Sequence, residues 1–558
     1  MTEGQPSGRR TGALLRRAVA SVMAGLLLWF ALTAPTDPAG LSPAPFVRLP
    51  AEALLAVALL LVLPAGARRT CAVAVGLVLG AVAIVKVLDL GFRSAFRRPF
   101  EPVTDWTYVG SSRDLLSDTI GPAAAVLVLA LTGAAMVGVL VLLPRSVLRL
   151  SRGVEGHRPT AVRVVAGLTL VWIACAATGA ELVPGTRVAS ASAATLASDH
   201  WHQSRAALRD REDFARAVAV DRFGDTASRE LLTGLRGKDV LVVFVESYGE
   251  VAVQGSPVSQ RISPTLDAGT ARLRAAGYST RSAWLTSPTF GGLSWLAHST
   301  LQSGLWVDSQ ARHDALLEHD RLTLSGAFRA AGWRTVGQIP ANRRDWPEGK
   351  AFYRWDQLYD SRNVGYAGPP FGYATMPDQY TLKVFFDREL ARPDRPPVMA
   401  EIDLVTSHLP WTPLPRLVDW DDVGDGSGYA AMRAASPSED VVWGDPRTVR
   451  AAYARAISYS IETVVSFVEW AQDHDLVLVV LGDHQPATVV SGERASHRVP
   501  ATVIARDPAV VERISGWGWR DGLRPDPRGP VWGMDAFRDR FLSAYGPVPG
   551  APPGASRR

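Results

Sequence analysis

The chain has 558 residues, with 59 Lys and Arg against 54 Asp and Glu, which gives a formal net charge of +5. This length can hold a membrane region and an α/β domain of roughly 300 residues. The charge excess is small, and no Lys- or Arg-rich tract carries interleaved aromatic residues, which argues against nucleic-acid binding. Both cysteines, Cys71 and Cys175, lie in apolar stretches, so the rest of the chain has no disulfide and no thiolate metal site.

The first third of the chain contains uncharged apolar runs. They cover residues 18–34, 53–67, 70–85, 120–144 and 164–180. Crossing a bilayer takes about 20 residues, with a range of ~17–25, so the second and third runs need their flanks. Glu52 and Lys86 lie near run ends, where a charged head group can reach the interface. The alternative for these two runs is a re-entrant or interfacial hairpin. We predict a five-span transmembrane region over residues 1–181.

The basic residues that flank the runs predict its orientation. Arginines precede the first run, separate the second from the third, and separate the fourth from the fifth (Arg9, Arg10, Arg16, Arg17; Arg68, Arg69; Arg145, Arg149, Arg152, Arg158, Arg163). With five spans, all three clusters face the cytoplasm, and everything after residue 180 lies outside the cell. The loop 93–118 is an exception, because it carries four arginines and still faces outside. The first run is followed by Thr36-Asp37-Pro38 rather than a small-residue cleavage site, which favours an anchor over a removable signal peptide.

Beyond the membrane region, the pattern changes to that of an α/β domain. Residues 182–237 are rich in Ala, Arg and Asp, and predict a helical juxtamembrane connector. Val-rich apolar runs then predict strands buried on both faces, at 239–248, 397–406, 475–481 and 499–505. Helical patterns lie between them, at 264–276, 322–331, 379–390 and 448–472. We predict a catalytic domain over 238–546 with a mostly parallel central sheet, followed by a disordered Pro/Gly-rich tail at 547–558.

Three acidic or imidazole side chains follow two of the predicted strands. Glu246 ends the first strand, and Asp483-His484 follows an aliphatic strand through Gly482, which permits a turn. Ligand sites of parallel sheets lie beyond the carboxyl ends of the strands. Carboxylate and imidazole ligands suit Mn²⁺, Zn²⁺ or Mg²⁺. Each residue alone has a simpler explanation, a capping or salt-bridged acid or a surface histidine, but their shared position favours a metal site.

A candidate nucleophile lies in the segment Ser287-Pro288-Thr289-Phe290-Gly291-Gly292. This turn-rich stretch precedes a helix expected at 294–302, and Thr289 is predicted at or just before the helix start, where backbone N–H groups bind anions. A hydroxyl becomes a good nucleophile when a cation activates it. Ser294 is the rival nucleophile. For either residue, the alternative is a helix N-cap.

Four short blocks together resemble a known superfamily. The blocks are VVFVESY, SPTFGGLSWLAHSTLQSG, VTSH and LGDHQP. They resemble the alkaline phosphatase/sulfatase superfamily, and most of all its lipoteichoic acid synthase-type membrane phosphotransferases. Those enzymes have five spans and an external catalytic domain. The resemblance implies that Glu246, Thr289, Asp483 and His484 bind one metal ion, commonly Mn²⁺, and that Thr289 forms a phosphothreonine intermediate. It implies that His408 contacts the substrate phosphate or moves a proton.

The chain also departs from that family. The synthases have a Lys-Thr-Ser block at the nucleophile, where this chain has Pro-Thr-Phe-Gly-Gly. Arg343 and Trp346 fall where the synthases place a head-group site, although a solvated charged loop explains the arginine equally well. His497 resembles a histidine near the site of phosphoethanolamine transferases, offset by one position. No Cys/Ser-x-Pro-x-Arg block surrounds Thr289, which disfavours sulfate-ester hydrolysis.

The sequence therefore predicts a multi-pass enzyme of the cell membrane with an extracellular catalytic domain. It would transfer a glycerophosphate-like head group from a phospholipid donor to a surface glycan or polymer acceptor. A phosphodiester or sulfate ester hydrolase of the same superfamily is the alternative, because the sequence does not identify the acceptor. A catalytically inactive membrane scaffold is a third reading, and the four competent metal-site positions argue against it.

Overall fold

A computed structural model describes residues 7–96, 98–107, 113, 116–117 and 120–547. The predicted disordered tail thus lies, apart from its first residue, outside the described residues. The chain divides into two compact units, residues 1–210 and 211–558. The boundary falls within helix α7 (Ser192–Ala219), which is the main element of the predicted connector.

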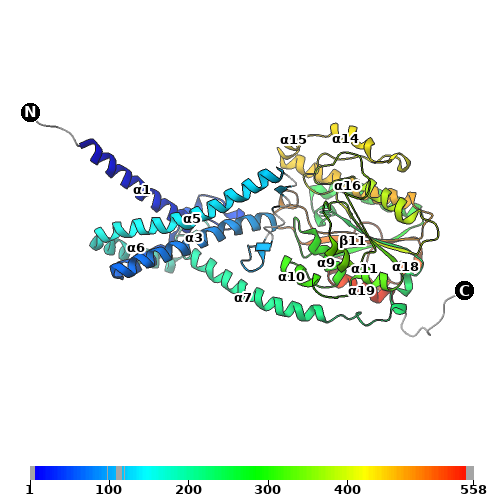
Figure 1. Cartoon of the computed structure of the whole chain (residues 1–558), viewed down its shortest axis with the longest axis horizontal. Coiled ribbons are helices and arrows are strands. Elements are labelled where there is room, and N and C mark those ends of the chain that lie inside the picture. The colour runs from blue at the N-terminus through cyan, green and yellow to red at the C-terminus, as the bar shows by residue number, and fades with distance from the viewer. Residues whose placement is uncertain (1–6, 97, 108–112, 114–115, 118–119, 548–558) are drawn as a thin grey trace, which may run out of the picture. The chain divides into compact units, whose positions relative to one another are not determined.

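The first unit is built from long apolar helices (Figure 1). They are α1 (Ser7–Thr33), α2 (Ala51–Val62), α3 (Ala65–Phe96), α5 (Pro122–Gly156) and α6 (Arg158–Thr178). Among the described residues, four segments are long and apolar enough to cross a membrane: Leu15–Thr33, Ala65–Ser94, Pro122–Gly156 and Arg158–Thr178. Helix α2 has 12 residues, or about 18 Å, and is shorter than the ~30 Å hydrocarbon layer.

Ion pairs and hydrogen bonds nevertheless show that α2 runs between the same two ends of the unit as its neighbours. At one end, Arg68, just after α2, forms an ion pair with Glu155 near the end of α5 (2.6 Å). There, Arg149 of α5 also donates to the carbonyl oxygen of Arg17 in α1 (2.6 Å). The start of α1, the α2–α3 junction and the end of α5 therefore meet at one end, which is where the three predicted basic clusters lie.

The opposite end of the first unit is marked by a second set of contacts. Lys86 Nζ of α3 donates to the carbonyl oxygen of Leu32 at the end of α1 (2.7 Å). The same carbonyl accepts from Ser192 Oγ at the start of α7 (3.2 Å). Glu52, at the start of α2, accepts from the N–H of Ala194 (2.9 Å). Helix α7 therefore begins at the end of the unit opposite the arginines.

The second unit contains an eight-stranded sheet with the order β12-β6-β11-β10-β5-β9-β7-β8. The strands are β5 (Asp239–Val245), β6 (Ser279–Thr286), β7 (Arg334–Ile339), β8 (Gln357–Asp360), β9 (Val398–Leu404), β10 (Leu476–Gly482), β11 (Arg498–Ala505) and β12 (Val531–Gly533). Only β11 runs antiparallel to its neighbours, β10 and β6; every other pairing is parallel. This confirms the predicted α/β class with a mostly parallel sheet.

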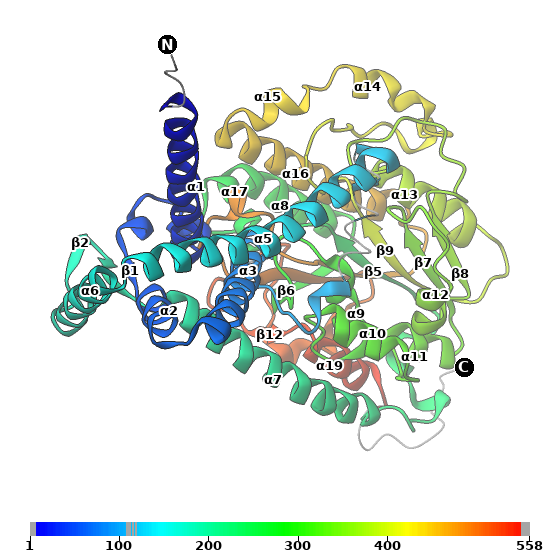
Figure 2. The same cartoon turned by 60° about the vertical axis from the view of Figure 1, so that its left-hand side comes forward.

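Helices cover both faces of the sheet (Figure 2). Alternate residues of β5 separate the two cores: Leu241 and Val243 pack with α8 (Pro257–Ala275) and α16 (Pro446–Trp470), which lie on one face. Val242 and Phe244 pack with α9 (Ser294–Ser303), α11 (Leu324–Ala330) and α19 (Ala536–Tyr545), which lie on the other. All seven residues of β5 are buried, as a strand covered on both sides requires.

The four predicted strands and the main predicted helices are present, with ends shifted by a few residues. The predicted helix at 264–276 begins earlier, at Pro257, with a capping box formed by Ser256 and Ser259. The predicted helix at 379–390 is α13 (Asp378–Phe385) followed by a π-helical turn, Phe386–Leu390. Strands β6, β7, β8 and β12 were not predicted.

Candidate metal and nucleophile site

The site forms where three adjacent parallel strands end. Strands β9, β5 and β10 are paired in register, with Val245 opposite both Leu404 and Gly482. Glu246 directly follows β5, and its N–H donates to the carbonyl oxygen of Leu404 (3.0 Å). Asp483 and His484 directly follow β10. The register therefore brings residues more than 230 positions apart to one edge of the sheet, as the strand-end prediction required.

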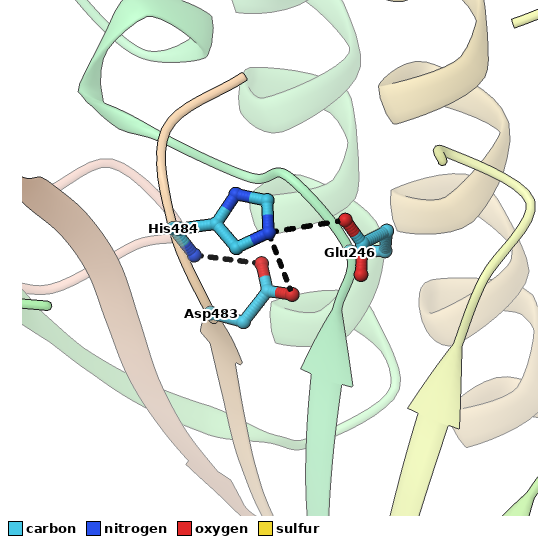
Figure 3. Close-up of side chains that lie close together, drawn as sticks. All are labelled: Glu246, Asp483 and His484. Carbon is cyan, nitrogen blue, oxygen red and sulfur yellow. Dashed lines mark hydrogen bonds and ion pairs between the residues drawn. The ribbon is translucent and has the colours of Figure 1, made fainter. Parts of the chain in front are cut away.

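Glu246, Asp483 and His484 point toward one another (Figure 3). Their ligand atoms all lie within 4.8 Å of one another, and all three residues are buried. His484 Nε2 lies 3.3 Å from Glu246 Oε1 and 3.6 Å from Asp483 Oδ2. Two ligands held ~2.1 Å from one tetrahedral ion are about 3.4 Å apart. The donor set and its spacing therefore fit a divalent cation.

The electrostatics of the three groups are coupled. Burial raises the pKa of Glu246, but the facing His484 outweighs burial and holds that pKa well below its usual range. Burial and the neighbouring Glu246 raise the pKa of Asp483. Burial lowers the pKa of His484, but Asp483 and Glu246 outweigh it and raise the pKa to about 9. His484 must therefore release a proton when it becomes a metal ligand.

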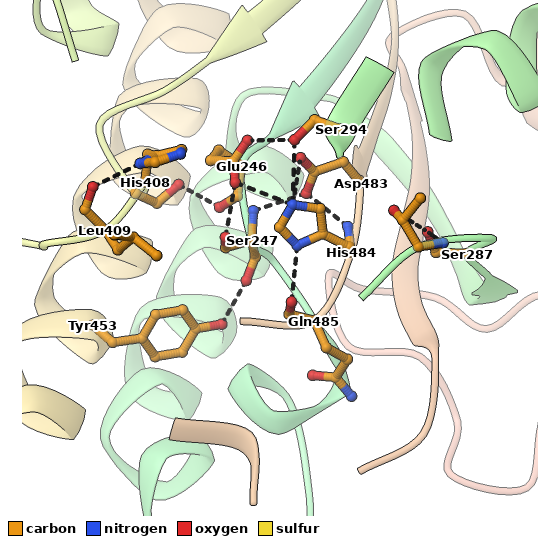
Figure 4. Close-up of polar contacts among 12 residues, drawn as sticks. Glu246, Ser247, Ser287, Ser294, His408, Leu409, Tyr453, Asp483, His484 and Gln485 are labelled. Carbon is orange, nitrogen blue, oxygen red and sulfur yellow. Dashed lines mark hydrogen bonds and ion pairs between the residues drawn. The ribbon is translucent and has the colours of Figure 1, made fainter. Parts of the chain in front are cut away.

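Backbone contacts fix the two ligand-bearing loops against each other (Figure 4). Asp483 Oδ1 accepts from the N–H of Ser247 (2.8 Å), and Tyr453 OH from α16 donates to the carbonyl oxygen of Ser247 (2.8 Å). His484 Nδ1 lies 2.8 Å from the carbonyl oxygen of Gln485, so Nδ1 carries a proton and Nε2 is left as the ligand atom. A Cβ on Gly482 would lie 1.9 Å from the Tyr248 carbonyl oxygen, so this close approach requires glycine.

Two serine hydroxyls contact this group: Ser247 Oγ donates to Glu246 Oε1 (2.8 Å), and Ser294 reaches both Glu246 and His484. Ser294 is the first residue of α9, and its Oγ donates to Glu246 Oε2 (2.9 Å) and lies 3.2 Å from His484 Nε2. Leu293, with a left-handed φ of 66°, turns the chain into the helix just before it. A hydroxyl at a helix N-terminus lies beside free backbone N–H groups, which favours an anionic substrate there.

Thr289 lies in the loop that precedes this helix. It is buried, its N–H donates to Ser287 Oγ (3.2 Å), and its Oγ1 lies 3.4 Å from the same oxygen. The helix begins at Ser294, where it was expected, and the loop between Thr289 and α9 runs through Gly291, Gly292 and Leu293. Within the described part of the chain, no hydrogen bond joins the Thr289 side chain to Glu246, Asp483 or His484.

His408 lies beside the site after β9, on the segment whose Ser407 Oγ donates to the backbone oxygen of Glu246 (2.6 Å). His408 Nδ1 lies 2.6 Å from the carbonyl oxygen of Leu409, so Nδ1 holds a proton and Nε2 has a lone pair. Burial lowers the pKa of His408, which keeps the ring neutral. The ring stacks on Tyr373 with centroids 3.8 Å apart.

The three predicted substrate residues lie around these loops. Arg343 is exposed, and its Nη2 lies 3.5 Å from the carbonyl oxygen of Tyr373, the residue that stacks on His408. Trp346 packs in the apolar cluster that also contains Leu293, next to the candidate nucleophile. His497 Nδ1 lies 3.2 Å from the carbonyl oxygen of Ser287. The contributions of Ser247 and Tyr453 to the site were not predicted, because no motif in the sequence marks either residue.

Comparisons with known proteins give only distant likenesses. The sequence matches no family model and no curated protein. The structure is similar to lipoteichoic acid synthase LtaP from Listeria monocytogenes, with 15% identity, a TM-score of 0.39, and coverage of 61% of this chain and 78% of that one. It is similar to an alkaline phosphatase superfamily protein from Vibrio parahaemolyticus, with 17% identity, a TM-score of 0.34, and coverage of 54% and 69%.

A third likeness is to the C-terminal periplasmic domain of EcEptC from Escherichia coli in complex with zinc, with 14% identity, a TM-score of 0.37, and coverage of 56% and 84%.

Proposed function

We propose that this chain is a membrane-anchored, metal-dependent phosphotransferase. It would move a glycerophosphate-like head group from a phospholipid donor to a surface glycan or polymer through a covalent phosphoryl-enzyme intermediate. The observation that carries the proposal is the Ser294 hydroxyl, which contacts both Glu246 and His484 at the start of α9. We assign the nucleophile to Ser294 on this geometry, in place of the Thr289 expected from the family resemblance.

The cation fits Glu246, Asp483 and His484, with Ser294 Oγ beside them, and Mn²⁺ is the ion we propose. When bound, it would stabilise charge on the phosphoryl oxygens and lower the pKa of the nearby hydroxyl. Ser294 Oγ forms a bond to phosphorus while the bond from phosphorus to the lipid oxygen breaks. The serine proton leaves along its hydrogen bond to Glu246, whose low pKa prevents that carboxylate from keeping it, and passes to the departing diacylglycerol oxygen, so the step has no net proton change.

His408 would act in the second half-reaction. The acceptor hydroxyl gives its proton to Nε2 of His408 while its oxygen attacks phosphorus; the bond from phosphorus to Ser294 Oγ breaks, and Oγ takes back one proton, so the step has no net proton change. The low pKa of His408 suits a base that must be neutral before the step. Arg343, near Tyr373, and Trp346 are proposed to contact the head group, and His497 to position the Ser287 loop.

The first unit supports a catalytic domain outside the cell. Its arginine-bearing helix ends meet at one end, where Arg149 contacts Arg17 and Arg68 contacts Glu155. Helix α7 leaves from the opposite end, beside Leu32. Because basic flanks stay cytoplasmic, the connector and the domain after it would lie on the external side.

Intact-mass analysis tests the nucleophile. The full chain in detergent is incubated with Mn²⁺ and phosphatidylglycerol, quenched in acid and mapped by peptide mass. We expect a glycerophosphate adduct on Ser294, its loss in Ser294→Ala, and its retention in Thr289→Ala. An adduct on Thr289 that persists in Ser294→Ala would refute our assignment while leaving the reaction class intact.

A second measurement separates transfer from hydrolysis. Labelled phosphatidylglycerol is supplied with and without an oligosaccharide or glycerophosphate acceptor. The proposal expects label on the acceptor and little free glycerophosphate when no acceptor is present. Steady release of free glycerophosphate without acceptor would instead establish a phosphodiester hydrolase.

A further inference from the structure

A second cluster of ligand-type side chains lies behind the first. His298 of α9 and Glu401 and Asp403 of β9 place their ligand atoms within 4.8 Å of one another. His298 Nδ1 lies 3.1 Å from Glu401 Oε1 and 3.5 Å from Asp403 Oδ1. These separations match the ~3.4 Å expected between two ligands of one tetrahedral ion.

The two carboxylates occupy positions that the fold otherwise fills with apolar side chains. Residues of β9 alternate between the faces of the sheet, so Met399, Glu401 and Asp403 share one face. Met399 packs in the core under α9 and α11, together with Val242 and Phe244 of β5. The Glu401 side chain is 1% exposed and that of Asp403 is 14% exposed. Burying uncompensated charge here costs several kcal/mol per ion, so packing alone does not explain two acids.

Hydrogen bonds leave one oxygen of each acid without a donor. The N–H of Ser325 donates to Gln302 Oε1 (2.9 Å), which orients the amide so that its Nε2 donates to Glu401 Oε2. Glu401 Oε1 and Asp403 Oδ1 are buried and have no hydrogen-bond partner among the described residues. Both face His298 Nδ1, which has at most one proton and cannot serve two acceptors.

The cluster also lies near the first site. Asp403 interacts electrostatically with Asp483 and Glu246, and His298 interacts with Asp483. Burial raises the pKa of Asp403 to about 8. Burial lowers the pKa of His298, but Asp403 and Glu401 outweigh it and raise the pKa to about 9. Without a cation the cluster therefore holds protons that a metal ion would displace. The His298 ring stacks on Phe244, with centroids 3.8 Å apart, and Gln302 donates to the Glu401 carboxylate, so the fold holds two of the three ligand groups in place.

We propose that His298, Glu401 and Asp403 bind a second divalent cation, Zn²⁺ or Mn²⁺, through Nδ1, Oε1 and Oδ1. Imidazole with two carboxylates is a donor set that these ions accept. The proposal goes beyond the function proposed above, which needs only the first cation. His298 follows Ser294 by four residues, one helical turn, on the same side of α9. A cation here therefore ties the first turn of α9 to β9 and positions Ser294.

Metal stoichiometry tests the proposal. The full chain in detergent is dialysed against Mn²⁺ and, separately, Zn²⁺, and bound metal is measured by mass spectrometry. We expect two ions per chain, one ion in Glu401→Gln and in Asp403→Asn, and one ion in Asp483→Asn. Glu439→Gln, at an exposed acid in α15 (Glu439–Trp443), controls for non-specific binding and should retain two. One ion in the wild type at saturation, or two ions in both cluster variants, overturns the proposal.

Anomalous diffraction from wild-type crystals grown with Mn²⁺ avoids any effect of the variants on folding. We expect two peaks, one at each cluster. A single peak between Glu246, Asp483 and His484 overturns the second site and leaves the proposed function standing. A single peak at His298, Glu401 and Asp403 supports the second site and contradicts the metal site of the proposed function.

Discussion

Substituting Gly482 by alanine should damage the site without touching a ligand. The new Cβ would lie 1.9 Å from the carbonyl oxygen of Tyr248 and 2.8 Å from its carbonyl carbon. Comfortable contact needs ~3.5 Å, so the loops after β5 and β10 must separate by roughly 1.5 Å. The loop after β5 carries Glu246, and the loop after β10 carries Asp483 and His484. A displacement of ~1 Å at a reacting centre can lower the rate about 100-fold.

The assay combines Mn²⁺ titration calorimetry with the rate of lipid head-group transfer. For Gly482→Ala we expect Mn²⁺ affinity to fall ~10–100-fold, as when groups that orient metal ligands are lost, and kcat/KM to fall about 100-fold. The control is Gly516→Ala, because a Cβ there has no atom within 4 Å. Wild-type affinity and rate in Gly482→Ala, with the fold intact by circular dichroism, would refute the view that this close approach sets the ligand geometry.

Three other outcomes follow from the charges and contacts of the second unit. Because the pKa of His484 is about 9 and metal binding displaces its proton, Mn²⁺ affinity should rise about tenfold per pH unit near pH 7 and less steeply as the pH approaches ~9. Calorimetry showing no pH dependence would contradict this. Burial lowers the pKa of His408, so the transfer rate should fall only when the pH drops below ~6.5, the ordinary histidine value. The pH profile of His408→Ala should lack this decrease at acidic pH. Arg538 is fully buried and donates two 3.0 Å hydrogen bonds to Asp221. Arg538→Met removes both and leaves Asp221 only the 3.8 Å contact with Arg321 and the N–H of Phe223. It should therefore lower the free energy of unfolding by up to ~3–5 kcal/mol in urea denaturation, whereas the exposed Arg433→Met should not.

The strands that position the site could be predicted because they are apolar on both faces. β5 and β10 consist almost entirely of Val, Leu and Phe, a composition typical of short strands buried on both faces. β6 was missed because it has no such pattern: its buried Ser282 lies 2.8 Å from the Thr502 hydroxyl of β11, so polar residues face each other inside the sheet. β12 has only three residues, too few for any periodicity.

The candidate site was predictable to the same extent. Glu246, Asp483 and His484 follow strands whose ends the sequence marks, so their meeting follows from parallel pairing. The choice between Thr289 and Ser294 did not follow, because both are hydroxyl residues that can cap a helix. It depends on side-chain contacts that only the structure gives: Ser294 Oγ reaches Glu246 and His484, whereas Thr289 Oγ1 lies 3.4 Å from Ser287 Oγ. The second cluster was not predicted either, because Glu401 and Asp403 lie within a strand that is otherwise mostly apolar.

The pairing of β5 with β10 also sets an order of events during synthesis. β5 ends at Val245, and its neighbour β10 begins at Leu476, so a ribosome must add more than 200 residues before the two can pair. Contacts between such distant segments form slowly, and an unpaired apolar strand is prone to aggregation while it waits. No N-terminal fragment that stops before His484 can assemble the first metal site. If the domain is exported as proposed, the chain must cross the membrane unfolded nearly to its end, and metal is acquired only afterwards.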